Sequence, residues 1–316
     1  MIKIALDMMG GDNAPSSNIY GAIDFLNQTP NKVKIYMVGD EKQISKLIDL
    51  QSFKSKIEMV HTTQVVDFND KPSKIIKTKP DSSMNKAIKL LKDKTVDAVL
   101  SSGNTGCLLS SSFFNLGTLP GIKRPALFAN IPSENGNFLL CDVGANSSSK
   151  PDHLVQFSKM ASIYMKYQLK VDNPRIALLN IGSEPNKGNE LIKNTYDMMS
   201  EEVNNFIGNI ESRYIFDGKA DIVICDGFTG NIVLKLIEGM MNYNADFISK
   251  KFNLTDVQIN NLKSLYDYEQ YGAVPILGIN GLVFKSHGSS SKTAIFNALQ
   301  IIQKVHEINL INKFNF

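Results

Sequence analysis

The sequence predicts an α/β protein with a mostly parallel sheet covered by helices on both faces, a three-layer α/β/α arrangement. Short apolar stretches recur along the chain without the alternation of a half-exposed strand, as expected where helices cover both faces of a sheet. Helical patterns alternate with these stretches, which favours parallel strands joined by crossovers. Small polar residues follow the apolar stretches, as in loops that lead from a strand into a helix.

The expected strands are apolar, and each one precedes a turn rich in glycine, asparagine, serine or aspartate. In chain order they are residues 2–7, 33–38, 97–100, 138–142, 175–180, 221–225 and 282–285. The series is interrupted neither by a fixed-period repeat nor by a low-complexity linker. We therefore predict a single α/β domain over residues 1–316.

The expected helices carry their apolar residues on one face. Between residues 82 and 94 the apolar positions follow the i, i+3, i+4, i+7 spacing of an amphipathic helix. A wider apolar stripe predicts a helix over residues 232–248. Thr255 and Gln258 form a capping-box pattern, which starts a second helix near residue 256 and carries it to residue 266. These two helices form an expected projection over about 231–268, and a further helix is expected from Lys292.

Composition excludes several classes of protein. The 316 residues, 43% apolar and 21% charged, are typical of a soluble globular enzyme and exclude general disorder. A net charge of +3 is too slight to predict nucleic-acid binding. No apolar run approaches the roughly 18 residues that span a bilayer, and no export signal is evident, so a cytoplasmic location is expected.

The sequence also lacks the common cofactor motifs. Its three cysteines and four histidines are scattered without the spacing of a metal site or a disulfide framework. It contains neither the G-x-G-x-x-G nor the P-loop pattern, which lowers the expectation of a dinucleotide or ATP. It has no G-x-S-x-G elbow, so a serine acyl-enzyme is not indicated. We expect no metal and no cofactor.

The loops after the strands are the candidate site, because ligands of an open parallel sheet bind outside the carboxyl ends of its strands. The stretch Gly103, Asn104 and Thr105 is more polar than a helix cap needs, and a helix N-terminus binds anions. The alternative interpretation is ordinary turn and cap chemistry, which any α/β protein requires.

Two further loops offer charged groups. His287 precedes Ser289 and Ser290, so this loop combines hydroxyl donors with a group that exchanges protons near neutral pH. The alternative is a capped helix with a structural histidine. Lys187 lies in a loop between strand and helix, where a lysine is either solvated or neutralises a bound anion. Asp142 and Asp226 end strands, where carboxylates either cap the next turn or take part in catalysis.

Several motifs occur in an order that is specific as a set, although each one alone is weak. They are residues 1–15 (MIKIALDMMGGDNAP), 102–106 (SGNTG), 124–126 (RPA), 142–146 (DVGAN), 178–182 (LLNIG) with 187–188 (KG), 205–211 (NFIGNIE), 226–235 (DGFTGNIVLK), 277–281 (LGING) and 287–290 (HGSS). Together they resemble the bacterial phosphate acyltransferase family (PlsX) over nearly the whole chain.

The resemblance implies a fold like that of phosphate acetyltransferase and the isocitrate and isopropylmalate dehydrogenases. It implies transfer of a fatty acyl group from acyl carrier protein to inorganic phosphate, which gives an acyl phosphate for phospholipid synthesis. It further implies a homodimer with peripheral membrane contact, whose product feeds a membrane glycerol-3-phosphate acyltransferase. Nucleic acid is not an expected partner.

Site residues follow from these motifs. We predict catalytic roles for His287, Lys187 and Asn104. We expect Lys187, Ser289 and Ser290 to hold phosphate, Asn104 and Thr105 to meet the reacting carbonyl, and His287 to handle a proton or to orient phosphate. The predicted substrate-binding residues are Gly11, Asp12, Gly103, Thr105, Asp142, Asn146, Asn180, Glu184, Asp226, Asn231, Ser289 and Ser290.

Two surfaces are expected to bind partners. The lysines between Lys71 and Lys94 form the densest basic stretch, which is either a dock for the acidic carrier protein or a solvated helix face. In the helical projection, we expect the part from Ile232 to Met241 to dimerise and the part from Phe247 to Leu254 to touch the membrane.

Three rival functions remain at this point. The first is a phosphate acetyltransferase acting on acetyl-CoA. The second is a decarboxylating dehydrogenase, which the small number of arginines, Arg124, Arg175 and Arg213, makes less fitting for a di-acid substrate. The third is a non-catalytic organiser of lipid synthesis, which would leave the phosphate-type loops without a purpose.

Overall fold

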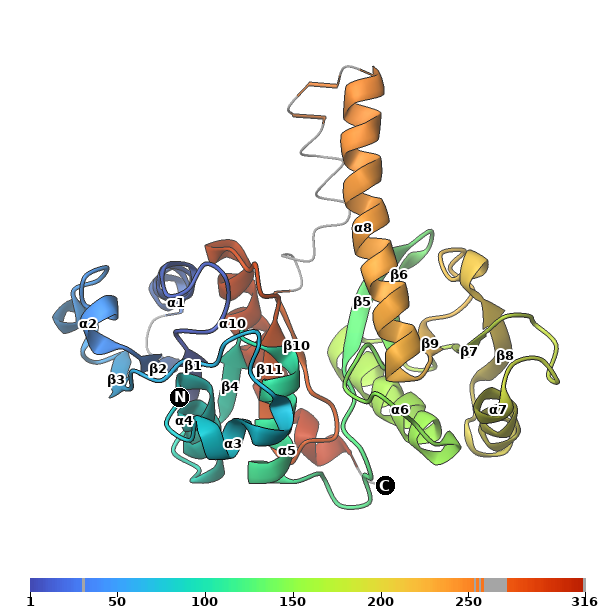
Figure 1. The fold of residues 1–316 in the computed structure, drawn as a ribbon, viewed down its shortest axis with the longest axis horizontal. Coiled ribbons are helices and arrows are strands. Elements are labelled where there is room, and N and C mark those ends of the chain that lie inside the picture. Colours follow the sequence, from blue (N-terminus) through green and yellow to red (C-terminus); the bar gives the residue numbers. More distant parts are fainter. Residues whose placement is uncertain (30–31, 253, 256, 259–271, 315–316) are drawn as a thin grey trace. The chain divides into compact units, whose positions relative to one another are not determined.

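The chain forms two compact units in a computed structural model that describes residues 1–29, 32–252, 254–255, 257–258 and 272–314 (Figure 1). Unit 1 consists of Met1–Ile122 and Tyr268–Phe316, so the C-terminal part of the chain returns to the N-terminal part. Unit 2 is the intervening segment, Lys123–Asp267. Each unit has its own sheet and its own buried core.

Unit 1 is built on a six-stranded sheet in the order β10-β11-β4-β1-β2-β3. Its strands are β1 (Ile2–Asp7), β2 (Val33–Gly39), β3 (Ile57–His61), β4 (Ala98–Ser101), β10 (Ala273–Pro275) and β11 (Leu282–Ser286). All neighbours are parallel except β10 and β11. The inner strands β1 and β4 are mostly apolar and are buried except at Lys3, which is why they show no regular alternation in the sequence.

Helices cover the sheet of unit 1. They are α1 (Ser16–Gln28), α2 (Glu41–Ile44), α3 (Ile75–Thr78), α4 (Ser83–Lys92), α5 (Thr105–Leu116) and α10 (Lys292–Glu307). Helices α1 and α10 pack side by side, with the rings of Phe25 and Phe296 edge to face at 6.2 Å between centroids. Helix α4 packs against β1 and against α5. Helix α4 begins after Ser82, whose hydroxyl accepts a hydrogen bond from the Asn85 amide.

Unit 2 is built on a five-stranded sheet in the order β5-β6-β9-β7-β8. Its strands are β5 (Phe128–Ser133), β6 (Gly136–Cys141), β7 (Ile176–Asn180), β8 (Phe206–Glu211) and β9 (Ile222–Ile224), and its helices are α6 (Pro151–Tyr164), α7 (Glu190–Glu202) and α8 (Gly227–Phe252). Only β5 and β6 pair antiparallel.

Helix α8 has two apolar faces. Ile237 is buried, and Val233, Leu234 and Met241 pack against the core of unit 2. The opposite face is solvent-exposed, and its large apolar residues recur every three or four positions: Phe228, Ile232, Leu236, Met240, Tyr243 and Phe247. Within the residues that the structure describes, no helix is both long enough and apolar enough to span a bilayer.

The mostly parallel α/β fold is confirmed, and its strands are divided between two sheets. Every strand named in the sequence analysis is present within a residue or two of its expected ends. The helix expected over residues 232–248 is longer and begins at Gly227. Thr255 and Gln258 do exchange capping-box hydrogen bonds, while the rest of the second projecting helix, residues 259–266, lies outside the described residues.

Candidate functional site

In unit 1, the carboxyl ends of three adjacent strands, β1, β4 and β11, meet at one edge of the sheet. Asn18 on α1 fixes the loop after β1. Its side-chain amide donates to the carbonyl oxygens of Asp7, Met8 and Gly10 at 3.1, 3.2 and 3.1 Å. One buried asparagine therefore determines the path of the loop that leads to Gly11 and Asp12.

The loop after β1 interlocks with the loops after β4 and β11. Gly11 has φ +104°, and a Cβ there would lie 3.0 Å from both the Gly288 carbonyl oxygen and the Ser102 Cβ. The Asp12 amide donates to the Gly288 carbonyl at 2.7 Å. The Asn13 side chain donates to the Ser289 carbonyl at 3.0 Å. A side chain at position 11 would separate these loops, so only glycine suits the position.

Asp7 is a buried carboxyl at the end of β1. The Ser101 hydroxyl donates to it at 2.6 Å, and the Gly103 amide donates to that hydroxyl oxygen at 3.1 Å. Burial raises the pKa of Asp7, while the hydrogen bonds from Ser101 and its neighbours oppose that rise. Through Ser101, Asp7 therefore connects the end of β1 to the loop after β4.

The loop after β11 holds the predicted His287, Ser289 and Ser290. The exposed His287 ring contacts the Ser289 hydroxyl at 2.8 Å through Nδ1, which also accepts from the Ser289 amide at 3.2 Å. Ser290 is buried, and its hydroxyl donates to the His287 carbonyl at 2.7 Å and contacts the Ser286 hydroxyl. Ser289 therefore lies with the histidine at the loop surface, whereas Ser290 supports the loop from inside.

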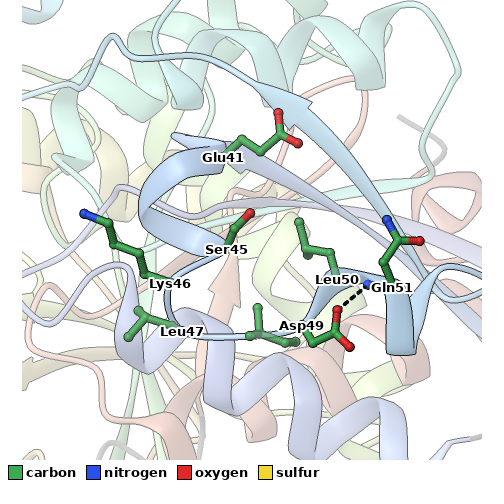
Figure 2. Close-up of a pocket in the computed structure, with 8 residues that line it drawn as sticks. Glu41, Ser45, Lys46, Leu47, Asp49, Leu50 and Gln51 are labelled. Atoms are coloured by element: carbon green, nitrogen blue, oxygen red, sulfur yellow. Dashed lines mark hydrogen bonds between the residues drawn. The ribbon is translucent and has the colours of Figure 1, made fainter.

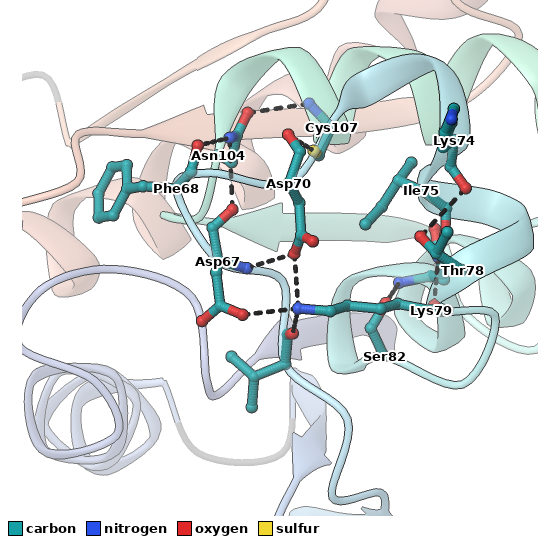
Figure 3. Close-up of polar contacts among 12 residues, drawn as sticks. Asp67, Phe68, Asp70, Lys74, Ile75, Thr78, Lys79, Ser82, Asn104 and Cys107 are labelled. Carbon is teal, nitrogen blue, oxygen red and sulfur yellow. Dashed lines mark hydrogen bonds and ion pairs between the residues drawn. The ribbon is translucent and has the colours of Figure 1, made fainter.

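Asn104 caps α5 and anchors a neighbouring loop (Figure 3). Its side-chain oxygen accepts from the Cys107 amide at 3.1 Å, and its side-chain nitrogen donates to the Phe68 carbonyl at 2.9 Å. The Thr105 amide is the first in α5, where the helix supplies no acceptor. Burial raises the pKa of the Cys107 thiol to about 11, so Cys107 is not an activated nucleophile.

The loop anchored by Asn104, residues 67–70, is held by ion pairs and carries the exposed ring of Phe68; we call it the Phe68 loop. The Lys79 ammonium lies 2.6 Å from a carboxylate oxygen of Asp67 and 2.6 Å from one of Asp70 (Figure 3). The Phe68 side chain is 69% exposed, and a Cβ on Gly288 would lie 3.7 Å from its ring. An apolar surface therefore adjoins the His287 loop.

Lys285 belongs to this edge, although the sequence analysis did not select it. It is partly buried near the end of β11, and its ammonium donates to the carbonyl oxygens of Ser102, at 3.4 Å, and Ser286. Burial lowers the pKa of Lys285 to about 8, against the charges of Asp7 and Asp12, which raise it. The sequence pattern was a lysine inside an apolar strand, directly before the His287 loop.

In unit 2, Asp142 is the centre of a different arrangement. Its carboxylate accepts from the amides of Leu127, Ala145 and Asn146 at 3.1, 3.0 and 2.9 Å and from the Asn146 side chain at 2.9 Å. Asn146 also donates to the Pro125 carbonyl at 2.8 Å. Burial raises the pKa of Asp142, and the four hydrogen bonds oppose that rise. The carboxylate is saturated by its own loop.

The first turn of α8 packs directly on this loop. A Cβ on Gly227 would overlap the Asn146 carbonyl oxygen, and one on Gly230 would overlap the Asp142 carbonyl oxygen. Asp226 caps the helix by accepting from the Thr229 amide at 3.0 Å and hydroxyl at 2.6 Å. Asn231 is exposed one residue beyond Gly230, and its Cβ lies 3.5 Å from a Cβ built on Gly144.

The loop after β7 holds the remaining predicted residues. Asn180 accepts from the Ile181 amide at 2.8 Å and donates to the Lys187 carbonyl at 3.1 Å, which closes the loop on itself. Glu184 and Lys187 are exposed on this loop. The predicted residues therefore form two groups: Gly11, Asp12, Gly103, Asn104, Thr105, His287, Ser289 and Ser290 in unit 1, and Asp142, Asn146, Asn180, Glu184, Lys187, Asp226 and Asn231 in unit 2.

Two other observations bear on ligand binding. Figure 2 shows a pocket of unit 1 that is lined by α2 and the turn after it, from Glu41 to Gln51, and contains none of the predicted residues. Among the described residues, no three histidine, cysteine, aspartate or glutamate side chains gather as they would around a metal ion. We therefore assign the candidate site to the interlocked loops of unit 1.

Comparisons with known proteins agree in sequence and in fold. The sequence matches the family described as "Fatty acid synthesis protein" over residues 2–313. It is 41% identical to the phosphate acyltransferase of Halothermothrix orenii over 323 residues, which is 98% of this chain and 96% of the relative. It is also 41% identical to the phosphate acyltransferase of Clostridioides difficile, with 99% and 97% covered.

Solved structures resemble the fold at low sequence identity. A phosphotransacetylase from Streptococcus pyogenes superimposes with a TM-score of 0.65 at 15% identity, covering 98% of this chain and 94% of that one. A branched-chain phosphotransacylase from Enterococcus faecalis gives 0.57 at 16% identity, covering 96% and 99%. These likenesses establish the fold alone, and they confirm the expected similarity to phosphotransacetylases.

Proposed function

Since this chain belongs to the phosphate acyltransferase family, which transfers acyl groups to phosphate, we propose that its acyl donor is acyl carrier protein. Its product would then be an acyl phosphate for phospholipid synthesis. A phosphate oxygen attacks the thioester carbonyl carbon, the carbon–sulfur bond breaks, and the carrier thiolate leaves and takes up a proton. The product is made in the cytoplasm for a membrane glycerol-3-phosphate acyltransferase.

The observation that carries this proposal is the interlocked edge of unit 1. Phosphate is already an anionic nucleophile at neutral pH, so the site needs donors that orient it rather than a strong base. The Ser289 hydroxyl and the His287 ring, 2.8 Å apart, suit one phosphate oxygen and the proton for the departing thiolate. The Thr105 amide suits the developing oxyanion. Asn104 acts by holding α5 and the Phe68 loop in place.

The Phe68 loop and the lysines after it are an argument for a fatty acyl donor on a carrier protein. Its exposed ring lies beside Gly288 and offers an apolar contact to an acyl chain or pantetheine arm. Lys71, Lys74 and Lys77 are exposed on the segment that follows. Their charges complement an acidic carrier and would mainly raise its rate of encounter.

Palmitoyl-acyl carrier protein with and without phosphate tests the reaction. We expect phosphate-dependent release of carrier thiol together with acyl phosphate. His287→Ala should lower kcat by about 100-fold if the ring handles the proton, whereas the control His306→Ala, near the far end of α10, should not change kcat. Turnover of acetyl-CoA without turnover of the palmitoyl carrier would replace this proposal with phosphate acetyltransferase activity.

Unit 2 residues are tested by the same assay. Lys187 is exposed on a loop that Asn180 holds closed, where its positive charge can meet an anionic substrate. Glu184 is exposed on the same loop. We expect Lys187→Ala to raise the KM for phosphate or donor, with Lys193→Ala on α7 as the control. Unchanged kcat and KM in Lys187→Ala would remove Lys187 from the predicted catalytic residues.

The exposed face of α8 supports a homodimer and a membrane contact. Leu236 is 63% exposed and Phe252, at the end of the helix, is 65% exposed. We assign Ile232 to Met241 to dimerisation and Phe247 to Leu254 to the membrane surface.

Opposite substitutions separate these two contacts. Leu236→Glu should give monomers in sedimentation and keep vesicle flotation, whereas Phe252→Glu should give dimers that no longer float. Asn244→Glu, at an exposed position of α8 between the two segments, controls for added negative charge. A dimer in Leu236→Glu or full lipid binding in Phe252→Glu would remove the corresponding assignment.

A further inference from the structure

Lys285 places an ammonium group where three loops converge. Its β11 strand pairs with β4, so the residue lies opposite Ser101, and its amine reaches the Ser102 carbonyl at 3.4 Å. The second carbonyl that it contacts belongs to Ser286, at the start of the His287 loop. Asp7, at the end of β1, and Asp12, on the loop after β1, are the acidic residues whose charges raise its pKa against the effect of burial. The amine is therefore held by the same loops that form the candidate site.

Two groups at this edge lack the partner that their chemistry requires. Among the described residues, no carboxylate lies within ion-pair distance of the Lys285 ammonium, and burial has lowered its pKa as expected for a charge that is not neutralised. The Ser102 hydroxyl is buried and has no hydrogen-bond partner in the described part of the chain. Buried polar groups are normally satisfied, so an exception calls for a missing water or ion.

Both unmet requirements are those of an anion. A carbonyl oxygen satisfies a lysine hydrogen bond without neutralising its charge, and Ser102 needs an acceptor or donor that the described residues do not supply. Asp7 does not fill this role, because it accepts from the Ser101 hydroxyl at 2.6 Å and is not within ion-pair distance of the Lys285 ammonium. Within the described part of the chain nothing supplies that partner, and an anion from solution fits both groups.

We propose that Lys285 binds the phosphate substrate through its ammonium group and that the Ser102 hydroxyl is a second donor to the same ion. This inference deepens the proposed function, on which it rests, by naming the charge that the acceptor meets in unit 1. It differs from the role of a lysine that only seals the loop by bonding to the Ser102 and Ser286 carbonyls. The two roles respond differently to substitution, because only phosphate binding requires the positive charge.

Steady-state kinetics with varied phosphate distinguish the roles. Lys285→Gln retains an N–H donor for the carbonyls and removes the charge, and Lys285→Met removes both. We expect both variants to raise the KM for phosphate about 10- to 100-fold, the loss of a charge-assisted hydrogen bond, with little change in the KM of the acyl donor. Lys34→Gln is the matched control, because Lys34 is also a strand lysine of unit 1 but is paired with Glu58 at 2.9 Å.

Rescue by glutamine would overturn the proposal, as would a phosphate KM within twofold of wild type in Lys285→Met. Ser102→Ala should raise the phosphate KM less than either lysine variant. If palmitoyl-acyl carrier protein is not a donor, the same phosphate titration is run with acyl-CoA. An error in the proposed donor is then distinguished from an error in the proposed role of Lys285.

Chemical labelling tests the contact in wild-type protein and does not depend on whether variants fold. Acetic anhydride acetylates deprotonated amines, and mass spectrometry of the peptide that contains Lys285 measures the rate. At a phosphate concentration about ten times its KM, acetylation of Lys285 should slow about tenfold relative to chloride of equal ionic strength, whereas Lys34 should not change. Equal rates in phosphate and chloride would show that phosphate does not reach Lys285.

Discussion

Asp142 in unit 2 and Lys285 in unit 1 both lie where an inner strand of a mostly parallel sheet reaches its carboxyl end. The Asp142 carboxylate receives four hydrogen bonds from its own loop and from Leu127. The Lys285 ammonium contacts two carbonyl oxygens, and within the described residues it meets no carboxylate at ion-pair distance. The same location in the two sheets therefore holds a satisfied charge in one unit and an unsatisfied charge in the other.

This difference separates two uses of polar residues at a strand end. A carboxylate that accepts four bonds holds the loop but has little capacity left for a substrate. An ammonium without a counterion lowers stability and is available to an incoming anion, a trade-off that is common at functional sites. Asp142 should therefore act on folding, and Lys285 on phosphate binding.

The largest effect is expected where α8 touches the Asp142 loop. Gly230→Ala would drive a methyl group into the Asp142 carbonyl oxygen and to 2.7 Å from the Cys225 sulfur, so the helix or the loop must move. We expect the free energy of unfolding to fall by about 3 kcal/mol or more, as for severe overpacking. Urea unfolding followed by far-UV circular dichroism measures the change.

Gly239→Ala is the control for that substitution. It lies in the same helix and a Cβ there has nothing within 4 Å, so the methyl group meets no obstacle. Alanine should raise stability by about 0.5 to 1 kcal/mol through its helix propensity. Equal effects of the two substitutions would show that the contact between α8 and the Asp142 loop is not tight.

Asp142→Asn should have the next largest effect. Asparagine replaces one accepting oxygen by an NH₂ group, which would face N–H donors, so we expect a loss of about 2 to 3 kcal/mol in unfolding free energy. Asp226→Asn is the control, since asparagine caps a helix as well as aspartate does. A fall in kcat with unchanged stability would instead assign Asp142 to catalysis.

Lys285→Met should raise stability at neutral pH. The folded-state pKa of about 8 lies below the unfolded value of 10.5, so folding penalises the charged amine, and wild-type stability should increase as pH rises from about 8 toward 10.5. The difference between the two pKa values corresponds to about 3 kcal/mol, and loss of the hydrogen bonds to the Ser102 and Ser286 carbonyls offsets part of it. Below pH 8 the variant should therefore be more stable by about 1 to 2 kcal/mol. Unfolding free energies measured from pH 6 to pH 10 should converge as pH rises; a constant difference would contradict the buried charge.

The apolar pattern predicted the fold, because buried parallel strands and amphipathic helices depend on local sequence. Its omissions have physical reasons. Strand β5 carries polar residues on an edge that pairs antiparallel, and β10 is three residues long, so neither stands out. Gly227 and Gly230 predict a turn, so the sequence does not indicate that α8 starts here. The helix has glycine at both positions because it packs closely on the Asp142 loop.

The site was predicted only in part, because its chemistry depends on contacts between distant segments. Motif order located the loops of Gly11, Asn104 and His287, which the structure brings to one edge of unit 1. Local sequence does not show whether the hydrogen-bonding capacity of a polar residue is already used within the fold, as that of Asp142 is. Lys285 was missed for the same reason, since its burial follows from the pairing of β11 with β4.

The smallest expected effect concerns the Phe68 loop, where Lys79 pairs with the exposed Asp67 and the half-buried Asp70. Lys79→Met removes the ammonium that lies 2.6 Å from both Asp67 and Asp70. Asp67 is largely exposed, so solvent screens the attraction, and we expect a loss of no more than about 1 kcal/mol in unfolding free energy. That loss should shrink at high salt, because screening already weakens the pairs in wild type. If Phe68 contacts the acyl chain, the same variant should raise the KM for a palmitoyl donor more than for a short acyl donor. An equal change for both donors would mean that the loop serves stability alone.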